Sequence, residues 1–165
     1  MANGFTVNSY SPKDIQLVIA GYTITGWERI SIARSVKGFT SIRGIRGKNT
    51  RVKNTDTSAT ITFPVLQTSQ SNEVLSSIHE QDLEYSTGRI SVILKDKSGK
   101  SVFSSDEAYL TSYPVTTFSG QFEFRTWELF LQKTGSYTLA GNARASTNLL
   151  DGLLDEASSF INDLF

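Results

Sequence analysis

The sequence contains no cysteine and only one histidine, His79, among its 165 residues. The lack of cysteine excludes disulfide scaffolds, cysteine-based zinc sites, iron–sulfur clusters and thiol nucleophiles. A metal cluster of two histidines cannot form within one chain, and a Ser-His-Asp triad would have to use His79. We therefore expect no catalytic residues, no metal site and no cofactor, and we predict that the protein is not an enzyme.

Long apolar runs are also missing, since none approaches the roughly 18 residues of a membrane-spanning helix. The first five residues, Met-Ala-Asn-Gly-Phe, lack the basic and apolar regions of a signal peptide. We expect a protein without a membrane anchor that is made in the cytoplasm. An aromatic content of 11% argues against disorder, and the length fits one domain.

Neither sign of charge is in excess, because 16 basic residues balance 16 acidic ones. The balance hides a split: residues 1–53 hold nine basic and two acidic residues, a net charge of +7, and residues 54–165 carry −7. Charge asymmetry of this kind indicates either a polyanionic partner or a chain whose ends meet other copies of itself.

Most of the excess positive charge lies in residues 37–56, which are rich in glycine and poor in apolar residues after Ile45. We predict a long exposed loop or a protruding hairpin there. The spacing of Gly44, Gly47 and Lys48 does not match a phosphate-binding loop, and Phe39 is the one aromatic residue available to stack on bases. Contact with the acidic surface of a neighbouring copy is favoured over nucleic-acid binding. The residues expected to make this contact are Lys37, Arg43, Arg46, Lys48, Arg51 and Lys53.

The rest of the chain has the composition of a β protein, with Thr, Ser, Val, Ile, Phe and Tyr broken by turn residues at short intervals. Residues 121–132 form the longest expected strand, and we expect its buried face to switch near Trp127 because Leu129, Phe130 and Leu131 are consecutive. A bulge or burial on both faces would explain this run. The other expected strands are residues 15–19, 27–33, 58–65, 89–94, 101–103 and 108–113, with a turn at 96–100.

Two segments have helical spacing. Residues 71–79 carry Val74, Leu75 and Ile78, and we predict one short helix whose C-terminus is near His79. His79 would then interact with the helix dipole rather than act in catalysis. Residues 82, 84, 106 and 107 are acidic and are interpreted as solvent-exposed loop acids.

The second helical segment is the C-terminus, where apolar residues recur at steps of three and four after a small-residue connector at 135–145. Residues 146–165 carry a net charge of −4, which suits an anionic membrane poorly. The helix either packs on its own β domain or docks on another chain. The residues expected to dock are Leu149, Leu150, Leu153, Leu154, Phe160, Ile161, Leu164 and Phe165. The predicted organisation is a β domain at 1–140 and a connector with an amphipathic helix at 141–165.

The order of these elements resembles the tail tube proteins of contractile-tailed bacteriophages. The resemblance covers about residues 5–135 and is carried by Ser58–Ser69 (S-A-T-I-T-F-P-V-L-Q-T-S) followed by Asn72–Ile78 (N-E-V-L-S-S-I). Phe124–Glu128 (F-R-T-W-E) is similar to the last strand of the family. The basic segment at 43–53 and the helix after Gly141 depart from the family pattern.

The resemblance implies a β-sandwich or distorted barrel with one short flanking helix, to which this chain adds the C-terminal amphipathic helix. It implies a structural virion protein that forms hexameric rings stacked into a tail tube, through which DNA passes without specific binding. Expected partners are further copies of the chain, the tail sheath protein, and baseplate and tail terminator proteins, assembled in the host cytoplasm. The basic segment would be the ring-stacking loop, with residues 82, 84, 106 and 107 as candidates for the opposing acidic face. The alternatives are a tube or tube-initiating subunit of a related contractile injection system, or a nucleic-acid-binding β-barrel.

Overall fold

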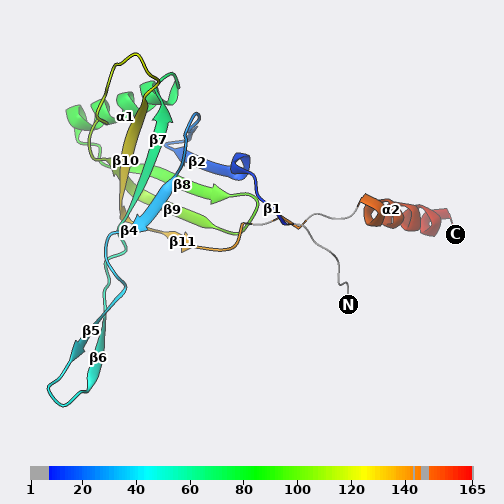
Figure 1. The fold of residues 1–165 in the computed structure, drawn as a ribbon, viewed down its shortest axis with the longest axis horizontal. Coiled ribbons are helices and arrows are strands. Elements are labelled where there is room, and N and C mark those ends of the chain that lie inside the picture. The colour runs from blue at the N-terminus through cyan, green and yellow to red at the C-terminus, as the bar shows by residue number, and fades with distance from the viewer. Residues whose placement is uncertain (1–7, 143, 146–148, 165) are drawn as a thin grey trace.

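The computed structural model describes residues 8–142, 144–145 and 149–164, and its centre is one strongly curved antiparallel sheet (Figure 1). The strand order is β3-β2-β8-β9-β10-β7-β4, and β11 pairs with β9. This confirms the mainly β fold, without closure into a barrel in the described residues. The strands are β2 (Ile15–Ile19), β3 (Tyr22–Thr23), β4 (Ser31–Arg34), β7 (Ala59–Leu66), β8 (Ile90–Asp96), β9 (Val102–Leu110), β10 (Phe124–Lys133) and β11 (Ser136–Thr138).

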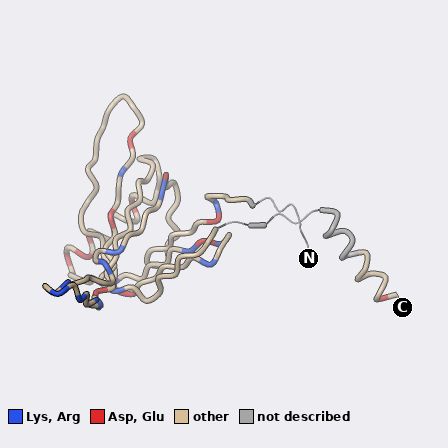
Figure 2. Tube along the Cα trace, turned by 60° about the horizontal axis from the view of Figure 1, so that its bottom comes forward, with Lys and Arg blue, Asp and Glu red and all other residues tan. Residues whose placement is uncertain are grey.

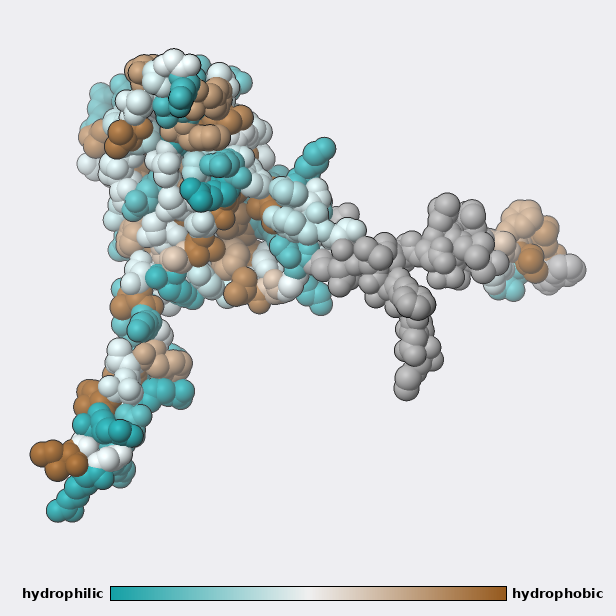
Figure 3. All heavy atoms as spheres, viewed as in Figure 1, coloured by the Kyte–Doolittle hydropathy of each residue, from teal (hydrophilic) through white to brown (hydrophobic). Residues whose placement is uncertain are grey.

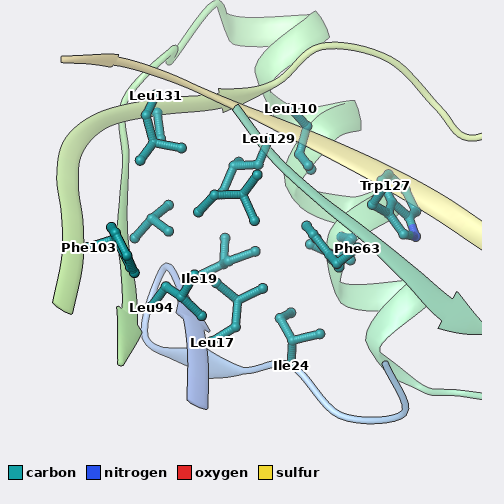
Figure 4. Packing of buried hydrophobic residues seen from close by; sticks show 14 of the residues in the cluster. Leu17, Ile19, Ile24, Phe63, Leu94, Phe103, Leu110, Trp127, Leu129 and Leu131 are labelled. Carbon is teal, nitrogen blue, oxygen red and sulfur yellow. The ribbon is translucent and has the colours of Figure 1, made fainter. Parts of the chain in front are cut away.

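The hydrophobic core lies inside the curve of this sheet (Figure 4). Leu17 and Ile19 of β2 face Phe63 of β7 and Leu129 of β10 across it, and all four side chains are buried. Opposite edges of the sheet thus share one core although they are not hydrogen-bonded to each other.

The expected change of face in the longest strand is wrong. Trp127, Leu129 and Leu131 of β10 all point inward, as strict alternation requires. Phe130 lies on the outer face, where its ring packs against Tyr109 at 5.4 Å between centroids. The three consecutive apolar residues therefore reflect an aromatic contact on the outer face, and the register shift comes later, between Leu131 and Lys133.

Three other boundaries differ from the sequence-based expectation. β4 begins at Ser31, because Trp27 makes only an isolated bridge to Val65. The two strands expected at 101–103 and 108–113 form the single strand β9, which is interrupted by a bulge where its register with β8 shifts. The connector at 135–145 contains β11 and also β12 (Arg144–Ala145), which pairs with β1 (Asn8–Ser9).

Helix α1 (Ser71–Tyr85) covers one end of the curved sheet (Figure 1). Its start is fixed by Asn72, whose amide donates to the carbonyls of Leu66 at 2.9 Å and Ser69 at 3.1 Å. The same side chain accepts a hydrogen bond from the indole of Trp127 at 3.0 Å. This buried amide thereby joins the end of β7, the helix and β10.

The expectation that His79 ends this helix is wrong, because α1 continues for six residues to Tyr85. The imidazole is buried and packs edge-on against Tyr113, with 4.6 Å between the ring centroids. Its Nδ1 has no hydrogen-bond partner among the described residues. His79 is therefore a packing residue of the interior rather than a partner of the helix dipole.

Two elements project from this body (Figure 1). The hairpin of β5 (Phe39–Arg43) and β6 (Asn49–Lys53) extends from the base of β4, and α2 (Leu149–Leu164) stands apart beyond β1 and β12. A short 3-10 helix, Pro12–Asp14, leads into β2. No helix in the described part of the chain is long and apolar enough to cross a membrane.

Candidate assembly surface: the basic hairpin

The segment predicted as a basic loop or protruding hairpin is a regular two-stranded hairpin, with all residues from Phe39 to Lys53 exposed. Its turn is closed by Gly44 N–H donating to the Lys48 carbonyl and Gly47 N–H donating to the Gly44 carbonyl, both at 2.9 Å. Gly47 has φ +84°, which a residue with a Cβ rarely adopts. The tip presents the fully exposed side chain of Ile45 to the surroundings.

The hairpin carries six basic residues and no acidic residue between positions 37 and 53. Figure 2 shows this positive charge concentrated at one end of the molecule, away from α2. Lys37 precedes β5, Arg43 ends β5, Arg46 and Lys48 lie in the turn, and Arg51 and Lys53 lie on β6. The structure thus brings together all the residues expected to contact a neighbouring copy.

The two faces of the hairpin differ in character, which the sequence analysis missed. The register pairs Ser41 with Arg51, and Arg43 with Asn49, so Arg43, Arg51 and Lys53 share one face with Phe39. The Arg51 guanidinium lies over the Phe39 ring, 4.1 Å from its centroid.

The opposite face of the hairpin carries Ile42 and Val52, both exposed, together with Thr40 and Thr50. Alternation within 39–43 and 49–53 was the signal that could have revealed one cationic and one β-branched face.

The base of the hairpin is held to the sheet by Arg34, the last residue of β4. Its guanidinium donates to the Thr57 carbonyl at 2.9 Å and to the Thr134 hydroxyl at 3.1 Å. It also lies over the Tyr137 ring, 4.2 Å from the centroid. These contacts fix the point from which the hairpin leaves the sheet.

On the returning strand, Asp56 forms a second brace at the base. Its carboxylate accepts a hydrogen bond from the backbone N–H of Ser58 at 2.9 Å. Hydrogen bonds from Ser58, and to a smaller extent the charge of Arg34, hold the pKa of Asp56 below its ordinary value of 3.8. The brace therefore depends on the ionised form of the side chain.

The end of the domain away from the hairpin carries helix α1 (Figure 1). Helix α1 carries four acidic residues and no basic residue, and Glu73, Glu80 and Glu84 are exposed. Asp82 has a local role instead, because its carboxylate accepts from the Gly88 N–H at 2.7 Å and braces the turn that ends the helix. Asp106 and Glu107 lie in the bulge of β9, where Asp106 is exposed and Glu107 is half-buried.

The C-terminal helix is present as expected, and it stands apart from the sheet (Figure 1). Phe160, Ile161 and Leu164 are exposed, so these three side chains do not pack on the β domain of the same chain. Leu149, Leu150, Leu153 and Leu154 lie within α2, and their side chains, like residue Phe165, are outside the described part of the structure.

No group of three or more potential metal ligands occurs among the described side chains. The described features that stand out are the exposed basic hairpin, the acidic helix α1 and the exposed apolar side chains of α2.

Comparison with known proteins places the chain in a family. It is 34% identical over 157 residues to Structural protein ORF10 of Pseudomonas phage KPP10, covering 88% of this chain and 90% of that protein. The chain belongs to the family of this phage structural protein. No protein-family model matches it.

Among solved structures, the tube-terminating cap of the anti-feeding prophage has the same fold. It aligns with a TM-score of 0.52 and 9% identity over 88% of this chain and 95% of that one. A chain from the sheath/tube terminator of the extracellular contractile injection system PVC aligns with a TM-score of 0.48 and 14% identity over 76% and 94% of the two chains.

Proposed function

We propose that the chain is the subunit of a contractile-tail tube: copies form hexameric rings, and the rings stack head to tail into a conduit for DNA. Membership of a phage structural protein family gives the general setting. The observation that carries the proposal is the β5–β6 hairpin, an exposed extension with six basic residues at the end of the domain away from the acidic helix α1. A subunit that stacks on copies of itself needs two ends that are complementary to each other.

The hairpin has the chemistry of a stacking element. Its cationic face, with Arg43, Arg51 and Lys53, attracts the exposed carboxylates of Glu73, Glu80 and Glu84 in the next ring. Charge complementarity sets register and orientation more than affinity. The β-branched face with Ile42 and Val52 can add apolar contact area, which supplies most of the affinity between proteins.

We propose the exposed acidic residues of α1 as the partner surface, in place of part of the set expected from the sequence. Residues 82, 84, 106 and 107 were its candidates, but Asp82 is engaged in the turn after α1 and Glu107 is half-buried. The exposed row on α1 is the better opposing surface, with Glu84 common to both sets.

Within a ring, the edges β3 and β4 of the open sheet supply unpaired backbone groups, and sharing these edges with neighbours would protect them. The lumen would contact DNA without specific binding, because phosphate contacts would slow its passage. The tail sheath, baseplate and tail terminator proteins are the other proposed partners, and the virion tail is the proposed location.

The test is a charge reversal at the turn of the hairpin. In the triple variant Arg43→Glu, Arg46→Glu, Lys48→Glu, we expect tube formation to be lost while the far-ultraviolet circular dichroism and melting temperature of the domain are kept. Negative-stain electron microscopy of the purified protein provides the measurement.

A matched control changes the net charge by the same amount elsewhere, through Arg89→Glu, Lys95→Glu and Lys133→Glu, which are exposed and lie outside the hairpin. We expect this variant to form tubes. Normal tubes from the hairpin variant, or equal loss in both variants, would contradict the stacking role.

A second candidate is a subunit that starts or closes a tube at a baseplate or terminator, in a phage or in a related contractile injection system. The fold shared with a tube-terminating cap supports it. A protein with this role would form single rings under conditions in which a tube subunit forms long tubes, so the same images distinguish the two.

Nucleic-acid binding by the hairpin has weaker support. Phe39 is the one aromatic residue of the hairpin, and Arg51 already lies over its ring. Stacking on bases would require that contact to be broken. A gel shift with steep salt dependence would favour this alternative.

A further inference from the structure

An apolar groove of about 400 Å³ opens in the curved sheet on the side away from α1. One wall comes from the segment before β4 and from β4 itself, and the other from β2, the β8–β9 hairpin and the segment after β11. Figure 3 shows apolar side chains in this hollow, between β4 and the strands beside it. Ile15, Trp27, Ile30, Ile32, Phe103 and Leu139 provide most of its apolar lining.

The groove reaches into the hydrophobic core. Ile15, Trp27, Ile30 and Ile32 pack against the core cluster but are only partly buried, and Leu139 at the rim is 82% exposed. At the other end of the sheet, α1 closes the core with Leu75 and Ile78. The sheet therefore has one end covered by a helix and a second apolar opening without such a cover in the described residues.

The same chain carries a helix whose described apolar side chains face solvent. In α2, Phe160, Ile161 and Leu164 are exposed, and they recur with the leucines of the helix at steps of three and four. A helix of 16 residues is about 24 Å long, and such helices gain most of their stability from burying an apolar face. Among the described residues the groove is an apolar surface without a cover, and the helix has apolar side chains that could cover it.

The charges of the two surfaces also match. Residues 149–164 contain four acidic residues and no basic residue. Arg29 lines the groove, and the exposed Lys13 and Lys100 adjoin the lining residues Pro12 and Ser101. Glu28 is exposed at the same rim, and Asp96 is buried, where its carboxylate accepts from the N–H and hydroxyl of Ser98. Basic residues therefore predominate among the exposed charges around the opening.

The path of the chain favours a groove in another copy. The chain leaves the groove at Asn142, pairs along β1 through β12 and continues into α2, which stands on the far side of that two-stranded ribbon (Figure 1). Only three residues, 146–148, separate β12 from α2, and they span about 10 Å at most. The described part of α2 therefore lies outside the groove of its own copy (Figure 1).

We propose that α2 of one copy docks into this groove of a neighbouring copy, so that each subunit closes the open end of the next. The inference rests on the proposed assembly into rings or tubes and adds a specific contact to it. Phe160, Ile161 and Leu164 enter between Trp27 and Leu139, and the acidic face of α2 lies beside Arg29.

The absence of cysteine makes a cross-linking test simple, because any disulfide must come from the introduced residues. One full-length protein carries Ile161→Cys and a second, with an affinity tag, carries Leu139→Cys at the exposed rim of the groove. The two are mixed under assembly conditions and oxidised. We expect a tagged heterodimer of about twice the 18.2 kDa chain mass on a non-reducing gel.

The control replaces Ile161→Cys by Ser159→Cys, which lies on the opposite face of the helix. We expect little heterodimer from this mixture. Ile30→Cys serves as a second groove position, and circular dichroism of each variant confirms its fold. Loss of the heterodimer in both groove positions, or equal cross-linking from Ser159→Cys, would overturn the proposal.

The alternative is that α2 docks into the groove of its own copy. The double variant Ile161→Cys, Leu139→Cys, kept dilute, tests this. A fast-migrating monomer from the double variant, without heterodimer from the mixed single variants, would overturn docking on a neighbour. Electron microscopy of the same samples separates the two proposals: tubes without the heterodimer refute only the docking, and the heterodimer without rings or tubes refutes only the tube.

Discussion

At the scale of single residues, the side chain of Asn72 connects three separate parts of the interior. It is buried and joins the end of β7, the first turn of α1 and the indole of Trp127 through three hydrogen bonds. The Leu66 and Ser69 carbonyls also accept backbone hydrogen bonds, from Ser69 and Asn72 themselves. The Trp127 N–H is the group that would lose its partner if the amide were removed.

We therefore predict that Asn72→Ala lowers the free energy of unfolding by about 2 to 3 kcal/mol, because it leaves a buried N–H donor without a partner. Urea unfolding followed by tryptophan fluorescence measures this. Asn49→Ala, at an exposed position of the hairpin, is the control and should change the value by less than about 0.5 kcal/mol. Equal effects of the two substitutions would contradict the role assigned to Asn72.

The ionisation of Asp56 predicts how the stability of the folded protein depends on pH. Its pKa in the folded protein is below the ordinary value of 3.8, because the carboxylate accepts hydrogen bonds from Ser58. A depressed pKa means that the stabilisation is complete above the ordinary value and is lost as the pH falls through the folded value.

We expect the wild type to lose stability more steeply than Asp56→Asn as the pH falls below the ordinary value of 3.8, since the variant lacks this ionisation. Urea midpoints measured at a series of pH values above and below 3.8 provide the test. The difference should be small, because the side chain is exposed to solvent. Parallel curves for the two proteins would show that the hydrogen bonds of Asp56 do not stabilise the fold.

At the scale of elements, the sequence predicted those whose pattern is local. Ile15–Ile19 and the turn between β8 and β9 were found because apolar alternation and turn residues lie within a few positions. The hairpin at 37–56 was found because its composition differs from its surroundings. These signals need no knowledge of the tertiary structure.

Elements that depend on distant contacts were predicted less well. The two faces of β10 were misassigned because Phe130 packs on Tyr109 of another strand, which no pattern within 121–132 reveals. Helix α1 was predicted to end near His79 because the apolar spacing was followed only as far as Ile78. The structure continues the helix to Tyr85 with Leu83 and Tyr85 exposed, so its last turns bury no apolar residue that could mark them. The groove has no sequence signal at all, since its lining comes from several separate segments.

The segment that follows β11 is tied to the β8–β9 turn, and Gly99 permits the close approach. The Ser101 hydroxyl donates to the Ala140 carbonyl at 3.0 Å and accepts from the Ala140 N–H at 2.9 Å. A Cβ at position 99 would collide with the carbonyl of Gly141. Only a glycine leaves room for these hydrogen bonds.

We predict that Gly99→Ala lowers the free energy of unfolding by about 1 to 3 kcal/mol, because backbone must shift to accommodate the methyl group. Thermal unfolding monitored by circular dichroism measures this. Gly120→Ala is the matched control, since a Cβ at Gly120 meets no atom within 4 Å. A similar loss in both variants would show that the effect does not arise from the contact with Gly141.

At the scale of the whole molecule, the charge balance predicts how assembly responds to salt. The six basic residues of the hairpin and the four acidic residues of α1 lie at opposite ends of the domain. Raising the ionic strength from 0.1 M to 1 M shortens the screening distance from about 10 Å to about 3 Å.

We therefore expect the rate of tube formation, followed by light scattering, to fall as sodium chloride is raised over this range. The hairpin triple variant should already be slow at low salt and should change little. Faster assembly at high salt would show that the face with Ile42 and Val52 dominates stacking and that charge complementarity is secondary.

The way the hairpin is attached has a consequence for how this molecule can diversify. β4 and β7 are neighbours in the sheet, and Arg34 at the end of one pairs with Ala59 at the start of the other. The whole segment between them is thus an insertion whose two ends are fixed side by side by the sheet. Because the entropy of closing such a loop grows only slowly with its length, the insertion can be lengthened, shortened or exchanged at little thermodynamic cost. Its partner specificity can therefore change independently of the fold, and a hairpin from a related subunit could be grafted between Arg34 and Ala59 to redirect which copies associate.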